Sequence, residues 1–179
     1  MTASRSGNLV VVTGASGFIG RHLTEYLVSD GMRVRGITRG ATDLPPGVEA
    51  AVASDLLDRN AIRAALSGAS AVVHLAARVH SRPEGKDDPA SECKRINVDG
   101  TSLLLEEAVA AGVSTFVFIS SVKAVASESE TALTPETPPQ PTDAYGESKL
   151  EAERLVRVAS VRSGFELRCS GCPSFTVRG

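Results

Sequence analysis

The stretch Asn8-Leu-Val-Val-Val-Thr-Gly-Ala-Ser-Gly-Phe-Ile-Gly20 decides the fold of this 179-residue chain. Residues 9–12 are a short apolar run rich in β-branched side chains, which is typical of a strand buried on both faces. Residues 13–20 then turn the chain, and residues 21–29 are expected to form a helix.

Gly14, Gly17 and Gly20 recur at every third position of this turn. Glycines at such spacing allow a tight turn and a close approach of the backbone to a dinucleotide pyrophosphate. The N-terminus of the following helix adds unpaired N–H groups and a partial positive charge. The alternative is an ordinary tight turn, but the strand before and the helix after it favour nucleotide binding.

Composition excludes several functional classes. A net charge of −2 and an aromatic content of 4% argue against a general binder of nucleic acid or of membrane surfaces. No apolar run approaches the roughly 20 residues that span a bilayer, and the N-terminus lacks the plan of a signal peptide. We therefore expect one cytoplasmic domain with no nucleic-acid or membrane partner.

Strand-like and helix-like segments alternate along the chain. This alternation predicts an α/β fold with a doubly wound parallel sheet. Residues 78–90 and 126–142 are rich in proline and polar side chains and are expected to be loops. The expected further strands are residues 33–38, 48–53, 71–77 and 115–119, and the expected further helices are residues 58–66, 91–111 and 144–160.

Tyr145 and Lys149 are four residues apart and share one face of the last expected helix. A neighbouring ammonium favours the phenolate form of a tyrosine and so makes it a usable proton donor and acceptor. Ser120 and Ser121 end the preceding strand, at the sheet edge where such folds place their sites. By spacing alone a surface Tyr–Lys pair is the commoner outcome. No metal site is predicted, because His22 and His80 have no ligand-like neighbours in the sequence.

Six motifs occur in a fixed order along the chain: residues 13–20, Asp55-Leu56, His74-Leu75-Ala76-Ala77, Asn97-Val-Asp-Gly-Thr101, Ser120-Ser121 and Tyr145-Gly-Glu-Ser-Lys149. Together they resemble the extended short-chain dehydrogenases/reductases. More narrowly, the chain resembles the NAD-dependent epimerase/dehydratase family, in particular its UDP-glucose 4-epimerase-like and UDP-hexose 4-reductase-like members. The resemblance covers residues 8 to about 166 and implies a Rossmann-like, three-layer architecture.

The resemblance implies a set of cofactor-binding residues. Asp55 would hydrogen-bond the adenine amino group, and Lys149 would hold the nicotinamide ribose. No acid follows the second strand at the position where NAD-binding proteins use one, and Arg39 there favours NADP; a solvent-facing arginine is the alternative, so the cofactor is left as NAD(P). The implied set is Gly14, Gly17, Phe18, Ile19, Gly20, Arg39, Asp55, Leu56, Ala76, Ala77 and Lys149.

The same resemblance implies the chemistry of a nucleotide-sugar 4-epimerase or 4-ketoreductase. Tyr145 would take the proton of the sugar 4-hydroxyl while hydride moves from C4 to the nicotinamide, and Lys149 would bias Tyr145. Ser121 would position the oxygen; we prefer it to Ser120 because Val-Lys follows it as in the subgroup. Asn97 would either brace the site or act directly. A UDP-hexose is the implied substrate, and a homodimer the implied assembly.

Residues 167–179 have neither a period nor a family pattern. We therefore divide the chain into a NAD(P)-binding domain at residues 1–166 and an off-pattern tail at residues 167–179. A one- or two-base frame slip near codons 166–169 would explain the tail. On this hypothesis the sixth strand is incomplete, the substrate domain is missing and the chain is weakly active or inactive. The alternatives are a non-catalytic dinucleotide-binding module and a truncation product without function.

Overall fold

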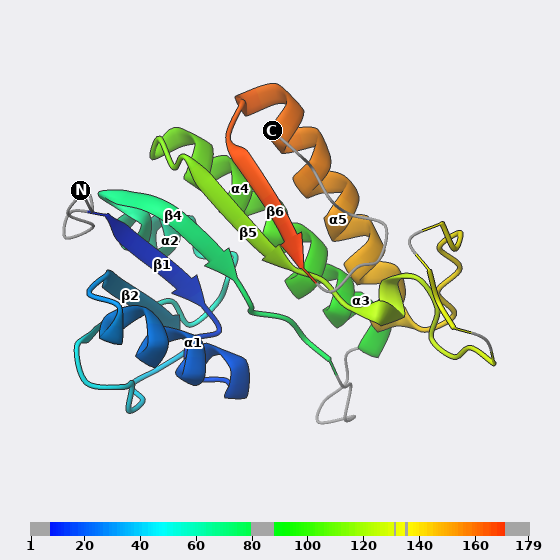
Figure 1. Ribbon diagram of the computed structural model, residues 1–179, viewed down its shortest axis with the longest axis horizontal. Coiled ribbons are helices and arrows are strands. Elements are labelled where there is room, and N and C mark those ends of the chain that lie inside the picture. The colour runs from blue at the N-terminus through cyan, green and yellow to red at the C-terminus, as the bar shows by residue number, and fades with distance from the viewer. Residues whose placement is uncertain (1–7, 80–87, 131, 135, 171–179) are drawn as a thin grey trace.

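A six-stranded parallel sheet forms the centre of the computed structural model, which describes residues 8–79, 88–130, 132–134 and 136–170 (Figure 1). The strands lie in the order β3-β2-β1-β4-β5-β6, so the chain winds outward in both directions from β1 and β4. This confirms the doubly wound sheet. The strands are β1 Leu9–Thr13, β2 Arg33–Thr38, β3 Val48–Val52, β4 Ala69–His74, β5 Thr115–Ile119 and β6 Glu166–Ser170.

A loop over residues 39–47 connects β2 to β3, whereas the other consecutive strands are connected by helices. Asp58 and Asp143 begin two of them, each with a side-chain oxygen that accepts a hydrogen bond from a backbone N–H of the first turn. The helices are α1 Phe18–Ser29, α2 Arg59–Leu66, α3 Pro89–Cys93, the π-helix η1 Lys94–Asp99, α4 Gly100–Ala110, the 3₁₀ turn η2 Val122–Ala124 and α5 Ala144–Ser163.

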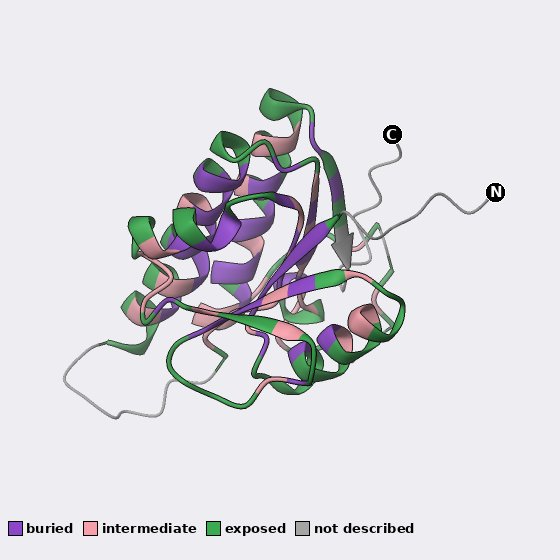
Figure 2. Cartoon of the chain, turned by 90° about the vertical axis from the view of Figure 1, so that its left-hand side faces the viewer, coloured by how far each residue is buried: buried purple, intermediate pink, exposed green. Residues whose placement is uncertain are grey.

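The side chains of β1 alternate between two hydrophobic cores. Leu9 and Val11 belong to the larger core, with buried residues of α2, α4 and α5, whereas Val10 and Val12 face the smaller core beside α1. Burying all four explains why this strand reads as a continuous apolar run rather than an alternating one. Buried residues accordingly follow the central strands and the inner faces of the helices (Figure 2).

Two helices differ from the expected boundaries. α1 begins at Phe18, so that Gly20 lies inside its first turn rather than in the loop. The segment expected as one helix over residues 91–111 is divided into α3, η1 and α4. Such a π-helical turn widens the ring of the hydrogen bonds without changing the apolar pattern, so periodicity does not reveal it.

Strand β6 extends beyond the point where the sequence pattern ends. It pairs with β5 from Glu166 to Ser170, and Leu167 is buried in the larger core. The regular structure therefore continues four residues past the proposed boundary at residue 166. The rest of the expected tail, residues 171–179, lies outside the described residues, as do residues 80–87 of the expected 78–90 loop and His80.

No helix in the described part of the chain is long and apolar enough to cross a membrane. Across the same residues, no group of three or more histidine, cysteine or acidic side chains is arranged to hold a metal ion.

Gly20→Ala is expected to lower the free energy of unfolding by about 1–3 kcal/mol or more, because overpacking forces the backbone to move. A Cβ at Gly20 would lie 2.2 Å from the carbonyl oxygen of Gly14. Urea unfolding measures the loss. Gly40→Ala is the matched control, since a Cβ there meets nothing within 4 Å. Equal stability of the two variants would contradict the expectation.

Candidate functional site

The turn between β1 and α1 lies directly against the end of β4. Gly14 has a φ of +69°, and a Cβ there would approach the backbone nitrogen of Ala76 to 2.9 Å. Only glycine meets both demands at this position. Gly17 donates its N–H to the carbonyl of Gly14 at 3.0 Å and caps α1 without a side chain. The N–H groups of the first turn of α1 are thus left to an outside acceptor such as a phosphate.

A cavity of about 540 Å³ opens beside this turn, at the carboxyl ends of β1 to β4. This is the size of a small-molecule site, and it lies where the strand order reverses between β1 and β4. The cavity is lined by residues 13, 14, 16 and 17 of the turn, residues 37–39, residues 53–56, residues 75–79, and Glu92, Arg95 and Ile96.

Most of the predicted cofactor residues line this cavity: Gly14, Gly17, Arg39, Asp55, Leu56, Ala76 and Ala77. Among the described residues, the remaining four are not part of its lining. Gly20 is buried within α1 and Lys149 within the body of the protein. Ile19 is exposed on α1.

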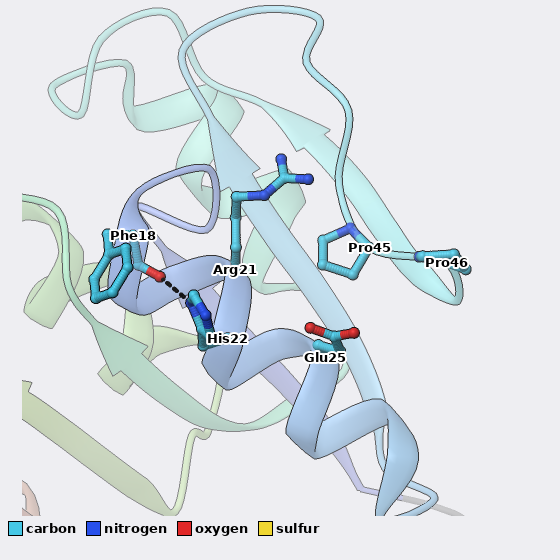
Figure 3. Close-up of a pocket in the computed structure, with 6 residues that line it drawn as sticks. All are labelled: Phe18, Arg21, His22, Glu25, Pro45 and Pro46. Carbon is cyan, nitrogen blue, oxygen red and sulfur yellow. Dashed lines mark hydrogen bonds between the residues drawn. The ribbon is translucent and has the colours of Figure 1, made fainter.

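Phe18 lies at a different hollow, a cavity of about 240 Å³ between α1 and the loop before β3 (Figure 3). Its side chain is 82% exposed and lies 4.8 Å from the ring of His22, centroid to centroid. His22 Nδ1 donates a hydrogen bond to the carbonyl oxygen of Phe18 at 2.8 Å. The other lining residues are Arg21, Glu25, Pro45 and Pro46.

Asp55 has both carboxylate oxygens engaged at the rim of the larger cavity. One oxygen accepts the N–H of Leu57 at 3.0 Å, and the other pairs with Nη1 of Arg95 at 2.7 Å. The backbone hydrogen bond from Leu57, followed by the interaction with Arg95, holds the pKa of Asp55 below its ordinary value. Asp55 is therefore a fixed acceptor at the end of β3. Arg39 is exposed at the end of β2.

A chain of buried hydrogen bonds runs from the glycine turn to α4. The hydroxyl of Thr13 accepts from the backbone N–H groups of Leu75 and Ala76 at 3.2 and 3.1 Å and contacts Nδ1 of His74 at 2.6 Å. Nε2 of His74 contacts the hydroxyl of Thr101 at 2.9 Å, and that hydroxyl donates to the carbonyl of Asn97.

These partners define the state of His74. The hydroxyl proton of Thr101 is used on Asn97, so Nε2 carries the proton of the ring and Nδ1 accepts from Thr13. Burial, and then the charge of Lys149, lower the pKa of His74 to about 3. His74 is thus a neutral, fully bonded histidine.

Asn97 extends this network to the candidate catalytic helix. Its side-chain oxygen accepts the N–H of Arg78 at 2.7 Å, and its side-chain nitrogen donates to the hydroxyl of Ser148 at 2.8 Å. Ser148 in turn donates to the carbonyl of Tyr145 at 2.7 Å. Asn97 therefore braces both the loop after β4 and the first turn of α5.

Lys149 and Glu153 of α5 hold consecutive residues at the end of β5. The Nζ of Lys149 donates to the carbonyl of Ile119 at 2.7 Å and lies 4.0 Å from the centroid of the Phe118 ring. Ser120 is buried and donates its hydroxyl hydrogen to Glu153, one helical turn beyond Lys149. Ser120 is therefore committed to the interior.

Ser121 and Tyr145 lie on the outer side of this junction, and both are half-buried. The hydroxyl of Ser121 accepts the N–H of Lys123 and so begins η2. α5 packs tightly on this turn, because a Cβ at Gly146 would lie 2.3 Å from the carbonyl oxygen of Lys123. Neither Ser121 nor Tyr145 is among the described residues that line the larger cavity.

Sequence reasoning assigned no role to Arg95, and it assigned Thr13 and His74 no role beyond their places in two of the motifs. A threonine directly before the first glycine was the one local signal for Thr13. The pairing of Arg95 with Asp55 joins residues 40 positions apart and leaves no local pattern.

The parallel sheet, the glycine turn and the cavity at the switch point define a Rossmann-type protein. The chain belongs to the NAD dependent epimerase/dehydratase family, whose model matches residues 10–174. It is 31% identical to the UDP-glucose 4-epimerase of Vibrio cholerae over 162 residues, which covers 88% of this chain and 49% of that protein. The chain spans about half the length, or less, of the curated relatives that it matches.

Two solved structures extend the comparison. A short-chain dehydrogenase/reductase superfamily protein from Agrobacterium tumefaciens with bound NAD superposes with a TM-score of 0.79 at 33% identity, over 90% of this chain and 48% of that one. MoeE5 in complex with UDP-glucose and NAD superposes with a TM-score of 0.76 at 35% identity, over 89% and 52%. Both carry NAD, so they lend no support to the NADP preference inferred from Arg39.

His74 is expected to make the folded state sensitive to acid. The unfolded chain binds a proton at His74 below the ordinary pKa of 6.5, whereas the folded chain does so only near 3. The free energy of unfolding therefore falls as the pH drops from 6.5 towards 3, by up to about 1.4 kcal/mol per pH unit from this group.

Urea unfolding across this pH range measures the effect, and His74→Gln should flatten the slope by that amount. The exposed histidine variant His22→Gln is the control. If His74→Gln does not fold, NMR titration of His74 in the unmodified protein gives the same answer. A ring that gains its proton near pH 6.5 would contradict the expectation.

Proposed function

We propose that this chain binds NAD through the β1–α1 turn and supplies the Ser121–Tyr145–Lys149 group of a nucleotide-sugar 4-epimerase or 4-ketoreductase. The proposal rests above all on Lys149. Burying an ammonium is costly unless it is hydrogen-bonded. The buried ammonium of Lys149 donates to the carbonyl of Ile119, the residue directly before Ser120 and Ser121. Lys149 itself lies four residues after Tyr145. A module that only bound a dinucleotide would need the glycine turn but not this arrangement.

The residues at the larger cavity fit a dinucleotide. Any Cβ at Gly14 would fill the space between the β1–α1 turn and the backbone of Ala76. The N-terminus of α1 can hold a pyrophosphate. Asp55 and Leu56 would contact the adenine. Ala76 and Ala77 would line the space for the ribose and the pyrophosphate. NAD is preferred over NADP because the similar solved structures carry NAD.

The group at the end of β5 would handle the proton. Tyr145 would accept the hydrogen of the sugar 4-hydroxyl, Ser121 would hydrogen-bond the same oxygen, and Lys149 would hold the nicotinamide ribose and bias Tyr145. Bound NAD would supply hydride acceptance and return at C4. Ser121 is preferred to Ser120 because the Ser120 hydroxyl is buried and already bonded to Glu153.

A UDP-hexose is the proposed substrate. MoeE5 was solved with UDP-glucose, and the similar Vibrio cholerae protein is a UDP-glucose 4-epimerase. A cytoplasmic homodimer is proposed from the family resemblance alone.

Tyr145→Phe is expected to lower turnover of UDP-glucose by about 10²–10⁴-fold, because proton transfer by a positioned side chain contributes that much. Binding of NAD, measured by calorimetry, should be unchanged. NAD binding without turnover by the unmodified chain would instead favour a non-catalytic dinucleotide-binding module or a truncation product without function.

Calorimetric titration with NAD and NADP tests the cofactor. NAD is expected to bind more tightly, and Arg39→Ala should leave its affinity unchanged, since the Arg39 side chain is exposed at the end of β2. Tighter binding of NADP that is lost in Arg39→Ala would show that Arg39 pairs with the 2′-phosphate and would overturn the choice of NAD.

A further inference from the structure

We propose that Arg95 forms one wall of the adenine subsite and stacks the flat face of its guanidinium on the purine of the bound dinucleotide. The inference rests on the proposed dinucleotide binding but not on the proposed catalysis. The family resemblance places the cofactor contacts at the ends of β1 to β4. Arg95 adds to them a binding residue that comes from η1.

Arg95 reaches across the end of β3 from the far side of the cavity. It extends from η1, pairs with Asp55 at 2.7 Å, and lines the cavity together with its neighbour Ile96. The β3 end is also docked on α4, because a Cβ at Gly100 would lie 2.7 Å from a methyl group of Leu56. The Asp55–Arg95 pair therefore closes one side of the space in which Leu56 would meet the adenine.

The pair leaves the guanidinium suited to stacking. Asp55 is fixed by the N–H of Leu57, and it engages Arg95 through one edge nitrogen. The side chains of Arg95 and Asp55 are 44% and 43% exposed, so neither is fully covered by the rest of the protein. A guanidinium held at its edge can lay its whole plane on an aromatic ring, whereas a lysine ammonium offers that ring only a compact, strongly hydrated point charge.

The test is calorimetric titration of the whole chain with NAD and with AMP. Arg95→Ala should weaken both ligands by about 3- to 30-fold, the range of a cation–π contact. Arg95→Lys should recover little of the loss, because it restores the charge but not the plane. Arg154→Ala, which removes an exposed cation from α5, is the matched control and should bind both ligands normally.

Nicotinamide hypoxanthine dinucleotide separates stacking from positioning of Asp55. It keeps a purine face but lacks the adenine amino group, so stacking predicts the same fold-loss in Arg95→Ala as NAD shows. A loss confined to NAD, or full affinity in Arg95→Lys, would overturn the proposal. Equal fold-losses for AMP, NAD and the hypoxanthine dinucleotide in Arg95→Ala would uphold it even if no sugar is turned over, whereas failure of the unmodified chain to bind both AMP and NAD would overturn it together with the proposed cofactor.

Discussion

The hydroxyl of Thr13 is the constraint on which the arrangement of the site depends. It accepts two backbone N–H groups from the end of β4 and donates to His74 on the same strand. The ends of β1 and β4 diverge at this point, since the chain winds away from them in both directions. The N–H of Leu75 also donates to the backbone carbonyl of Thr13 at 3.3 Å, whereas the N–H of Ala76 has the Thr13 hydroxyl as its acceptor at 3.1 Å. The Thr13 side chain thus ties the end of β1 to the end of β4, and it does so at the wall of the larger cavity.

The charges around this network are compatible only in one protonation state. Burial lowers the pKa of His74, and the charge of Lys149 lowers it further. A second proton on the ring would also leave Thr13 with three donors directed at its oxygen and no acceptor for its own hydrogen. The neutral His74 ring therefore adds no second positive charge near the buried Lys149 ammonium. It also keeps its hydrogen bond to Thr13 at the start of the glycine turn.

The alternating elements, the glycine turn and the caps at Asp58 and Asp143 were predictable, because each depends on residues close together in the chain. Gly20 was placed in the loop rather than in α1, since a helix that begins with Phe-Ile-Gly has no capping side chain to mark its start. The π-helical turn and the extension of β6 to Ser170 depend on tertiary hydrogen bonds that no local pattern records. For the same reason, only part of the cavity lining was predicted. Arg95, which pairs with Asp55 at the rim of the cavity, was not.

Ser121, Tyr145 and Lys149 are not among the described residues that line the larger cavity. Asn97 links this cavity to α5, which carries Tyr145 and Lys149. The amide oxygen of Asn97 accepts the N–H of Arg78, which lines the cavity, and its amide nitrogen donates both to the carbonyl of Arg78 and to the hydroxyl of Ser148 in the first turns of α5. Either contact alone would be a local brace. Because one planar amide makes both, the distance between the two parts is fixed by a rigid group rather than by flexible loops. Asn97 lies within the π-helix η1, so the residue that makes both contacts comes from this irregular turn between α3 and α4.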